Sequence, residues 1–204
     1  MANAQAPLVA VFADESCLGN GREGANPGGA GVLVEYARAA GEIVRRDLWV
    51  AEPATTNNRM ALRSVIEAFG AIGNKGTRFR VVFTTDSRYI VDGMSRWVHD
   101  WARRDWKRKA GPIENLELWR DAVRSVNGHE VEWRWVRGHA GHAQNEYANH
   151  LATTAAAQQT NSAGLADSAY AVWAARVSAS VSKMRLEPFP DGEAFRAAPR
   201  LPVV

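Results

Sequence analysis

The sequence predicts an α/β protein with a mixed sheet, whose strands and helices follow in the order β-β-β-α-β-α-α-β-α. Three observations predict this class. Three β-branched runs lie within the first fifty residues, helical periodicity follows them, and two further strand-like runs are separated by helical segments. With 204 residues, 46% of them apolar and 23% charged, the chain can bury a sizeable core. The composition excludes a disordered chain and a small disulfide-stapled scaffold.

The first three strands are expected at 8–13, 31–36 and 42–50. A Gly-rich loop and a short turn separate them, so they should pair antiparallel. The polar cluster Thr55–Asn58 then supplies capping chemistry for a first helix, in which apolar side chains recur with helical spacing. The remaining elements are expected as a strand at 79–83, helical segments up to 126, a strand at 130–136 and a last helix at about 144–157.

Beyond residue 157 the composition changes to Ala, Ser and Pro. We expect a main domain at 1–157 and an extension at 158–204, helical around 168–184 and irregular afterwards. Cys17 is the single cysteine, which excludes an internal disulfide and favours a reducing compartment. No apolar run is long enough to span a bilayer, and the N-terminus lacks the pattern of a secretory signal. We therefore expect a cytoplasmic protein without membrane association, acting as a monomer.

Two aspartates each follow directly after an expected strand. Asp14 ends the first strand and Asp86 the fourth. If these strands are parallel neighbours, both carboxylates emerge at one edge of the sheet, where open α/β sheets commonly bind ligands. Paired carboxylates suit Mg²⁺, which prefers oxygen ligands. The alternative is structural: Asp14 begins a turn and Asp86 caps a helix.

A basic segment with interleaved tryptophans lies at 96–109. It contains six cationic and two acidic residues, which give it a local net charge of +4, whereas the whole chain has a net charge of +3. This mixture suits phosphate contacts together with apolar contact to sugars or bases. The tryptophans, spaced four and five apart, could equally form the core stripe of a helix. The six cations are Arg96, Arg103, Arg104, Lys107, Arg108 and Lys109, and the tryptophans are Trp97, Trp101 and Trp106.

Two further segments offer polar side chains at expected element ends. Thr55–Asn58 could receive a phosphate or a ribose hydroxyl at a helix N-terminus, although capping alone would explain one of its four residues. His139 lies in a Gly-rich loop with His142 nearby, where a histidine can shuttle a proton beside a metal site. A structural role for His139 is the alternative.

Taken in order, five segments resemble ribonuclease H of type 1, the family that cuts the RNA strand of RNA/DNA hybrids. The resemblance runs from about residue 9 to residue 157 and implies a five-stranded mixed sheet flanked by helices. It also implies that the segment 97–109, called the handle below, grips the DNA strand. The five segments are Asp14–Asn20, Thr55–Met60, Thr85–Tyr89, Trp97–Lys109 and Trp133–Glu146.

In that family four acids hold two Mg²⁺ ions about 4 Å apart. The resemblance places these acids at Asp14, Ala61, Asp86 and Asn149, so two of the four are not acidic here. A methyl group cannot ligate a metal, and Asn149 keeps an oxygen but loses the charge. Fewer anionic ligands predict weaker binding of a divalent ion such as Mg²⁺ or Mn²⁺.

Glu15 stands where the family usually has glycine, directly after the first acid. We hypothesise that Glu15 partly replaces the carboxylate missing at 61, because one acid is lost and one gained near the same cleft. Strand alternation argues against this, since it directs Glu15 to the face opposite Asp14. The alternative is an exposed glutamate on a loop.

Two functions follow from the resemblance. The first is a metal-dependent hybrid endonuclease, impaired or with altered metal dependence, in which His139 helps proton transfer and Asn149 is a weak ligand. The second is an inactive module that binds RNA/DNA hybrids or double-stranded nucleic acid. Both predict salt-sensitive binding. The resemblance implies contacts on the RNA side from Asn20, Thr56, Asn57, Asn58 and Arg88, and on the DNA side from Trp97, Trp101, Lys107, Arg108 and Lys109.

Overall fold

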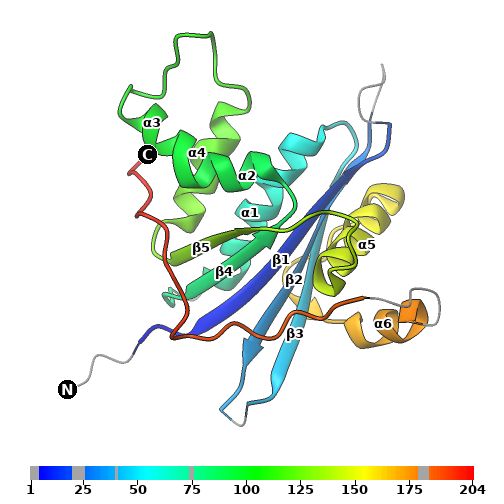
Figure 1. Ribbon diagram of the computed structural model, residues 1–204. Helices are drawn as coiled ribbons and strands as arrows, with labels where there is room; N and C mark the ends of the chain where they lie inside the picture. Colours follow the sequence, from blue (N-terminus) through cyan, green and yellow to red (C-terminus); the bar gives the residue numbers. More distant parts are fainter. Residues whose placement is uncertain (1–4, 20–25, 40, 74–75, 179–183) are drawn as a thin grey trace.

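The computed structural model describes residues 5–19, 26–39, 41–73, 76–178 and 184–204 (Figure 1). A mixed sheet runs through it in the strand order β5-β4-β1-β2-β3-β6. The central strand β1 pairs antiparallel with β2 and parallel with β4, which in turn pairs parallel with β5. The strands are β1 (Leu8–Cys17), β2 (Gly28–Ala37), β3 (Ile43–Glu52), β4 (Arg80–Thr85), β5 (Glu130–Trp135) and β6 (Ala166–Asp167).

The predicted fold class is confirmed, with one addition. The sheet has a sixth strand, because β6 from the extension pairs antiparallel with β3. This strand is only two residues long, and Asp167 in it forms an ion pair with Arg46 of β3. A two-residue strand leaves no alternating run in the sequence, so pattern alone could not predict it.

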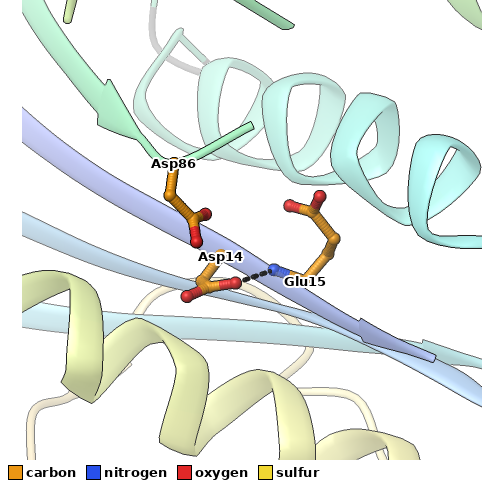
Figure 2. A group of neighbouring side chains, drawn as sticks. All are labelled: Asp14, Glu15 and Asp86. Carbon is orange, nitrogen blue, oxygen red and sulfur yellow. Dashed lines mark hydrogen bonds between the residues drawn. The ribbon is translucent and has the colours of Figure 1, made fainter. Parts of the chain in front are cut away.

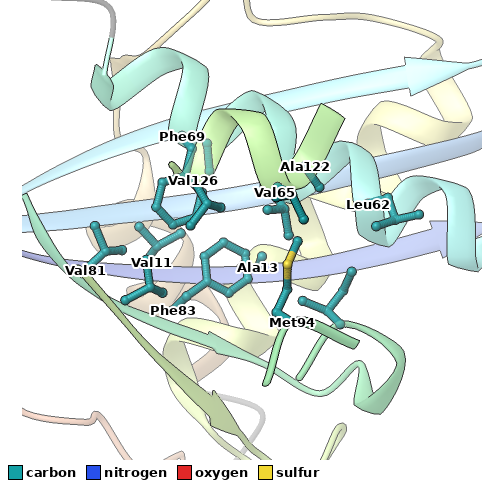
Figure 3. Close-up of a cluster of buried hydrophobic side chains, with 14 of the residues drawn as sticks. Val11, Ala13, Leu62, Val65, Phe69, Val81, Phe83, Met94, Ala122 and Val126 are labelled. Carbon is teal, nitrogen blue, oxygen red and sulfur yellow. The ribbon is translucent and has the colours of Figure 1, made fainter. Parts of the chain in front are cut away.

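Helices cover both faces of the sheet (Figure 1). On one face, α1 and α4 pack over β1 and β4, and the main core lies beneath them. There Phe69 of α1 stacks with Phe83 of β4 at a ring-centroid distance of 5.9 Å, as Figure 3 illustrates. On the other face, α5 packs on β1 and β2 over a smaller core. The helices are α1 (Asn57–Gly73), α2 (Arg88–Asp92), the π-helical turn η1 (Gly93–Trp97), α3 (Val98–Ala102), α4 (Leu116–Val126), α5 (Ala143–Gln158) and α6 (Tyr170–Ser178).

Two glycines of β2 let α5 lie directly on the sheet. A Cβ atom added to Gly31 would lie 2.2 Å from the carbonyl oxygen of Ala148, and one added to Gly29 would lie 2.3 Å from that of Ala152. Side chains at these positions would push the helix away. The close approach matters for function because the first turn of α5 reaches the end of β1.

After α6 the chain returns along the β5 edge of the sheet; we call residues 185–204 the tail. The amide of Ala198 donates to the carbonyl of Val131 in β5 at 2.7 Å, and the Arg80 guanidinium donates to the carbonyl of Gly192 at 2.9 Å. Leu201 joins the main core. Within the described part of the chain, no helix has the length and apolar character needed to cross a membrane.

Candidate active site

The parallel pairing of β1 and β4 brings Asp14 and Asp86 together, as the sequence predicts. Ala13 stands opposite Thr85 at the last matched position, so the two aspartates follow at the same level of the sheet. Glu15 joins them. One carboxylate oxygen from each of the three residues lies within 4.8 Å of the others, and Figure 2 shows the three side chains gathered where β1 passes the end of β4.

Glu15 does not lie on an exposed loop, so that interpretation is wrong. β1 continues to Cys17, and Glu15 pairs with Ala30 of β2 inside the strand. Its Oε2 atom is buried and has no hydrogen-bond partner. Figure 2 shows the side chain reaching toward α1, the helix that carries Ala61.

Glu15 and Asp14 leave β1 on opposite sides, as strand alternation predicts (Figure 2), but this does not keep them apart, because β4 ends at Thr85, one residue short of the level of Asp14. Beyond that point β1 has no neighbouring strand on the β4 side. Side chains that leave β1 toward opposite faces can therefore bend round this open edge and meet.

Burial, together with nearby negative charges, raises the pKa of all three carboxyl groups. Burial, followed by the nearby charge of Asp86, raises the pKa of Asp14 to about 8. Burial, with the charges of Asp14 and Asp86, raises the pKa of Glu15 well above its ordinary value. The pKa of Asp86 is also raised, again chiefly by burial. Such a group of carboxylates becomes favourable in its ionised form when a cation lies among them.

Two donors orient Asp14. The backbone amide of Glu15 donates to its Oδ1 at 2.7 Å, and the side-chain amide of Asn145 donates to its Oδ2 at 3.1 Å. Asn145 lies in the first turn of α5 and is 1% exposed. The sequence places Asn145 within a motif of the resemblance but does not by itself indicate this role. The sequence feature that could have indicated this role is its position, one helical turn before Asn149 on the same helix face.

None of the hydrogen bonds of the described residues links Asn149 to the three carboxylates. Asn149 is partly buried on α5, and its Oδ1 accepts a hydrogen bond from the Thr153 hydroxyl at 3.5 Å. Ala61 is fully buried in the core of α1. Of the four positions that the resemblance implies, Asp14 and Asp86 meet, and Glu15 supplies the third carboxylate.

The loop at residues 137–142, called the histidine loop, lies against Asp86. A Cβ atom added to Gly138 would lie 2.1 Å from Oδ2 of Asp86, so only glycine allows this approach. His139 has a positive φ of 53°, and its side chain is 76% exposed. Its Nδ1 lies 3.9 Å from Oε2 of Glu146, whose other oxygen accepts from the amide of Gly141 at 3.3 Å. His139 thus lies at the mouth of the site with its side chain open to solvent.

The residues present fit a divalent metal ion. Three carboxylates offer hard oxygen ligands within 4.8 Å of one another, and Oε2 of Glu15 is buried without a partner. Magnesium takes such ligands and fills its remaining positions with water or substrate phosphate. Asp14, Glu15 and Asp86 would hold the ion.

The residues expected on the RNA side differ in their surroundings. Thr56 caps α1, since its hydroxyl accepts from the amide of Arg59 at 3.3 Å. Asn57 is partly buried with its Oδ1 unpaired, and Asn58 is exposed. The Arg88 guanidinium lies 3.9 Å above the ring of Trp135, whose indole nitrogen donates to the carbonyl of Asp86 at 3.0 Å. Asn20 lies outside the described residues.

In the handle, the tryptophans pack against the core, whereas three of the cations are exposed. The rings of Trp97 and Trp101 lie 6.3 and 5.5 Å from the ring of Trp119, which is fully buried. Trp97 and Trp101 thus pack against the main core while staying partly exposed, and Trp106 lies beyond the end of α3, so the three do not form a single helical stripe. Lys107, Arg108 and Lys109 are exposed on the loop beyond α3, and Lys107 forms an exposed ion pair of 2.8 Å with Asp105.

The sheet order, with acids at the ends of β1 and β4, defines a ribonuclease H-like α/β fold. Comparison with known proteins agrees: residues 6–157 match the family described as RNase H. Ribonuclease H of Erythrobacter litoralis is 41% identical over 153 residues, which cover 74% of this chain and 98% of that protein. Ribonuclease H of Neisseria meningitidis is 42% identical over 151 residues, covering 74% and 96%. The chain belongs to the ribonuclease H family.

Two solved structures extend this comparison. LC9-RNase H1, described as a type 1 RNase H with the type 2 active-site motif, is 78% identical. It matches 100% of this chain and 97% of its own with a TM-score of 0.94. LC11-RNase H1, solved in complex with an RNA/DNA hybrid, shares the fold at a TM-score of 0.53 and 16% identity, covering 74% and 98%. The first match includes the extension as well as the main domain.

Proposed function

We propose that this protein is a ribonuclease H that hydrolyses the RNA strand of RNA/DNA hybrids, using Mg²⁺ or Mn²⁺ held by Asp14, Glu15 and Asp86. The observation that carries the proposal is the convergence of these three carboxylates within 4.8 Å at the end of β1. Family membership supports the reaction, and the similar LC9-RNase H1, a type 1 enzyme with the type 2 active-site motif, supports a displaced set of acids.

Glu15 changes the expectation of an impaired enzyme. The loss of acids at 61 and 149 predicted only two carboxylates, one after the first strand and one after the fourth. With Glu15 in place, three anionic ligands remain, and affinity for a hard divalent ion depends on that number. Asn149 then serves as a neutral ligand or positions water, because it shares a face of α5 with Asn145.

Each residue has a task that its surroundings support. When bound, the divalent ion activates the attacking water and stabilises the leaving oxygen. Asn145 and the amide of Glu15 orient Asp14 toward the centre of the site. His139, exposed at the mouth, handles the proton or assists product release. Arg88 and the amides of Asn57 and Asn58 face the RNA strand and its phosphates, with Thr56 fixing the helix end beside them.

The DNA strand would contact the handle. Lys107, Arg108 and Lys109 are exposed there, and positive groups at the surface bind phosphates by displacing counterions. Trp97 and Trp101, which are partly exposed although they pack on Trp119, would add apolar contact to the DNA strand. We also propose that the main domain spans 1–157 with 158–204 as an extension packed on it, and that the protein acts as a cytoplasmic monomer.

The test is cleavage of a labelled RNA/DNA hybrid with Mg²⁺ and with Mn²⁺, compared with double-stranded RNA and DNA. We expect metal-dependent cleavage of the hybrid RNA strand alone, and its loss in Asp14→Asn and Asp86→Asn. Tight, salt-sensitive binding with no cleavage at saturating Mn²⁺ would instead identify the protein as an inactive hybrid-binding module.

A further inference from the structure

A chain of three hydrogen bonds connects the tail to Asp14. Oε2 of Glu187 in the tail lies 2.6 Å from Nε2 of His142. Nδ1 of His142 accepts from the backbone amide of Asn145 at 3.3 Å and thereby caps α5. The side-chain amide of Asn145 then donates to Oδ2 of Asp14 at 3.1 Å. Residues far apart in the sequence thus form one continuous path into the site.

The path requires one tautomer of His142. Because Nδ1 accepts from a backbone amide, it cannot carry a proton, so the ring proton belongs to Nε2. Nε2–H then donates to Glu187. The hydrogen bond from His142 lowers the pKa of Glu187, which keeps that carboxyl ionised as the acceptor. In the other tautomer Nδ1–H would face the Asn145 amide, and the cap would be lost.

Glu187 is itself held firmly. Its backbone amide donates to Oε1 of Gln144 at 3.0 Å, and its carbonyl accepts from Nε2 of Gln144 at 2.7 Å. Gln144 is fully buried, so this paired contact is protected from water. The Arg134 guanidinium donates to the second oxygen of Glu187 at 3.3 Å.

Arg185 strengthens the same connection two residues earlier in the tail. Its amide donates to the carbonyl of Gly141 at 2.8 Å, and its carbonyl accepts from the amide of Ala143 at 3.0 Å. The tail therefore contacts both sides of His142, between the histidine loop and the first turn of α5. The tail is held here by hydrogen bonds between particular backbone and side-chain groups, and not only by apolar contact.

We propose that Glu187 is a positioning residue for the hydrolytic site: it selects the Nε2-protonated form of His142, which caps α5 and holds Asn145 against Asp14. The inference rests on the proposed function, because it takes Asp14 as a metal ligand. Groups that orient a ligand from outside typically change metal affinity or activity by roughly 10–100-fold. Through Glu187, the tail therefore helps to position a metal ligand of the active site.

The first experiment measures the His142 tautomer directly, from the ¹⁵N chemical shifts of its ring in the metal-free full-length protein at neutral pH. The parent should show the Nε2-protonated form. Glu187→Gln, whose amide oxygen still accepts, should keep it, and Glu187→Ala should show a mixture of tautomers. Nδ1 protonation in the parent, or an unchanged tautomer in Glu187→Ala, would overturn the inference. This measurement needs no catalysis. It can therefore support or contradict the role of Glu187 even if the protein proves not to be a hydrolase.

The second experiment measures hybrid cleavage against Mn²⁺ concentration. Glu187→Ala should raise the concentration for half-maximal activity roughly tenfold, while the KM for hybrid stays within about twofold, because the contacts of Glu187 are with Arg134, His142 and Gln144 and not with the handle. Glu187→Gln and the matched control Glu193→Ala, an exposed tail glutamate, should resemble the parent. An unchanged Mn²⁺ requirement in Glu187→Ala, with only a lower melting temperature, would show a purely structural role.

A double mutant keeps the inference testable if Glu187→Ala folds poorly. Asparagine is a good N-cap residue, so His142→Asn should cap α5 without help from the tail. In that background Glu187→Ala should leave the Mn²⁺ requirement unchanged. A full tenfold effect in both backgrounds would overturn the proposed path through His142.

Discussion

Gly138 contacts Asp86 so closely that a Cβ atom would lie 2.1 Å from Oδ2 of the carboxylate. We predict that Gly138→Ala forces either Asp86 or the histidine loop to move. Because a displaced ligand weakens catalysis strongly, kcat should fall by about tenfold or more. The measurement is steady-state cleavage of an RNA/DNA hybrid at saturating Mn²⁺.

The matched control for that prediction is Gly70→Ala. Gly70 lies in α1 with no atom within 4 Å of an added Cβ, and alanine favours a helix. This variant should keep full activity and melt at the same or a higher temperature. Equal kcat in the two glycine variants would show that the contact with Asp86 has no catalytic consequence.

A glutamate at position 61 of α1 should replace the carboxylate that is lost when Glu15 of β1 is changed to alanine. Glu15→Ala should reduce cleavage about tenfold or more, and adding Ala61→Glu to it should recover much of the loss, because the Glu15 side chain reaches toward α1, the helix that carries position 61 (Figure 2). Ala61→Glu alone should lower the melting temperature, since it buries a fourth carboxylate in a fully buried position. Cleavage rates and thermal melts of the three variants check this, and no recovery in the double variant would contradict it.

The raised pKa of Asp14 predicts how the metal-free protein responds to pH. In the unfolded chain Asp14 ionises near its ordinary value of 3.8, but in the folded protein only near 8. Between these values the folded state binds more protons, so its contribution to the free energy of unfolding decreases as pH rises from about 4 to about 8. Glu15 and Asp86, also raised, act in the same direction.

Asp14→Asn tests this without catalysis. Removing the carboxyl should raise the melting temperature of the metal-free protein at pH 8 by at least about 2–4 °C, the change expected from about 1 kcal/mol. At pH 5 the gain should be smaller. Mn²⁺ should stabilise the parent more than the variant at pH 8. A variant less stable than the parent at pH 8 would contradict the assigned electrostatics.

The handle cations should control salt dependence. Changing Lys107, Arg108 and Lys109 to alanine together should weaken hybrid binding at low salt and reduce the slope of log affinity against log salt by about 0.9 for each phosphate that the protein no longer neutralises. The control changes three exposed arginines elsewhere, Arg38, Arg176 and Arg200, to alanine, which removes the same charge. Equal slopes in both variants would mean that net charge alone, rather than the handle, governs binding.

The fold was predictable from local patterns. β-branched runs marked the strands, and capping residues marked the start of α1 near Asn57. These features depend on residues close together in the sequence, which is why pattern and composition were sufficient. The meeting of Asp14 and Asp86 was predicted only on the condition that their strands are parallel neighbours, and the pairing of β1 with β4 meets that condition.

The rest of the site depends on tertiary contacts that leave no local pattern. The orientation of Glu15 depends on where β4 ends relative to β1, a detail of register. The hydrogen bond from Asn145 to Asp14 and the docking of Glu187 on Gln144 join segments of the chain that are remote in sequence. The tail was therefore expected only as an extension, and the sequence did not indicate its role.

The central claim is that Glu15 supplies the carboxylate missing at 61, and Glu15→Gln tests it most directly. This change keeps the size of the side chain and removes only its charge. Hybrid cleavage should be measured against Mn²⁺ concentration for the parent and for Glu15→Gln, with thermal melts to confirm folding. We predict a folded variant whose cleavage rate falls by about tenfold or more at saturating Mn²⁺. A folded variant that cleaves at the parent's rate would contradict the account.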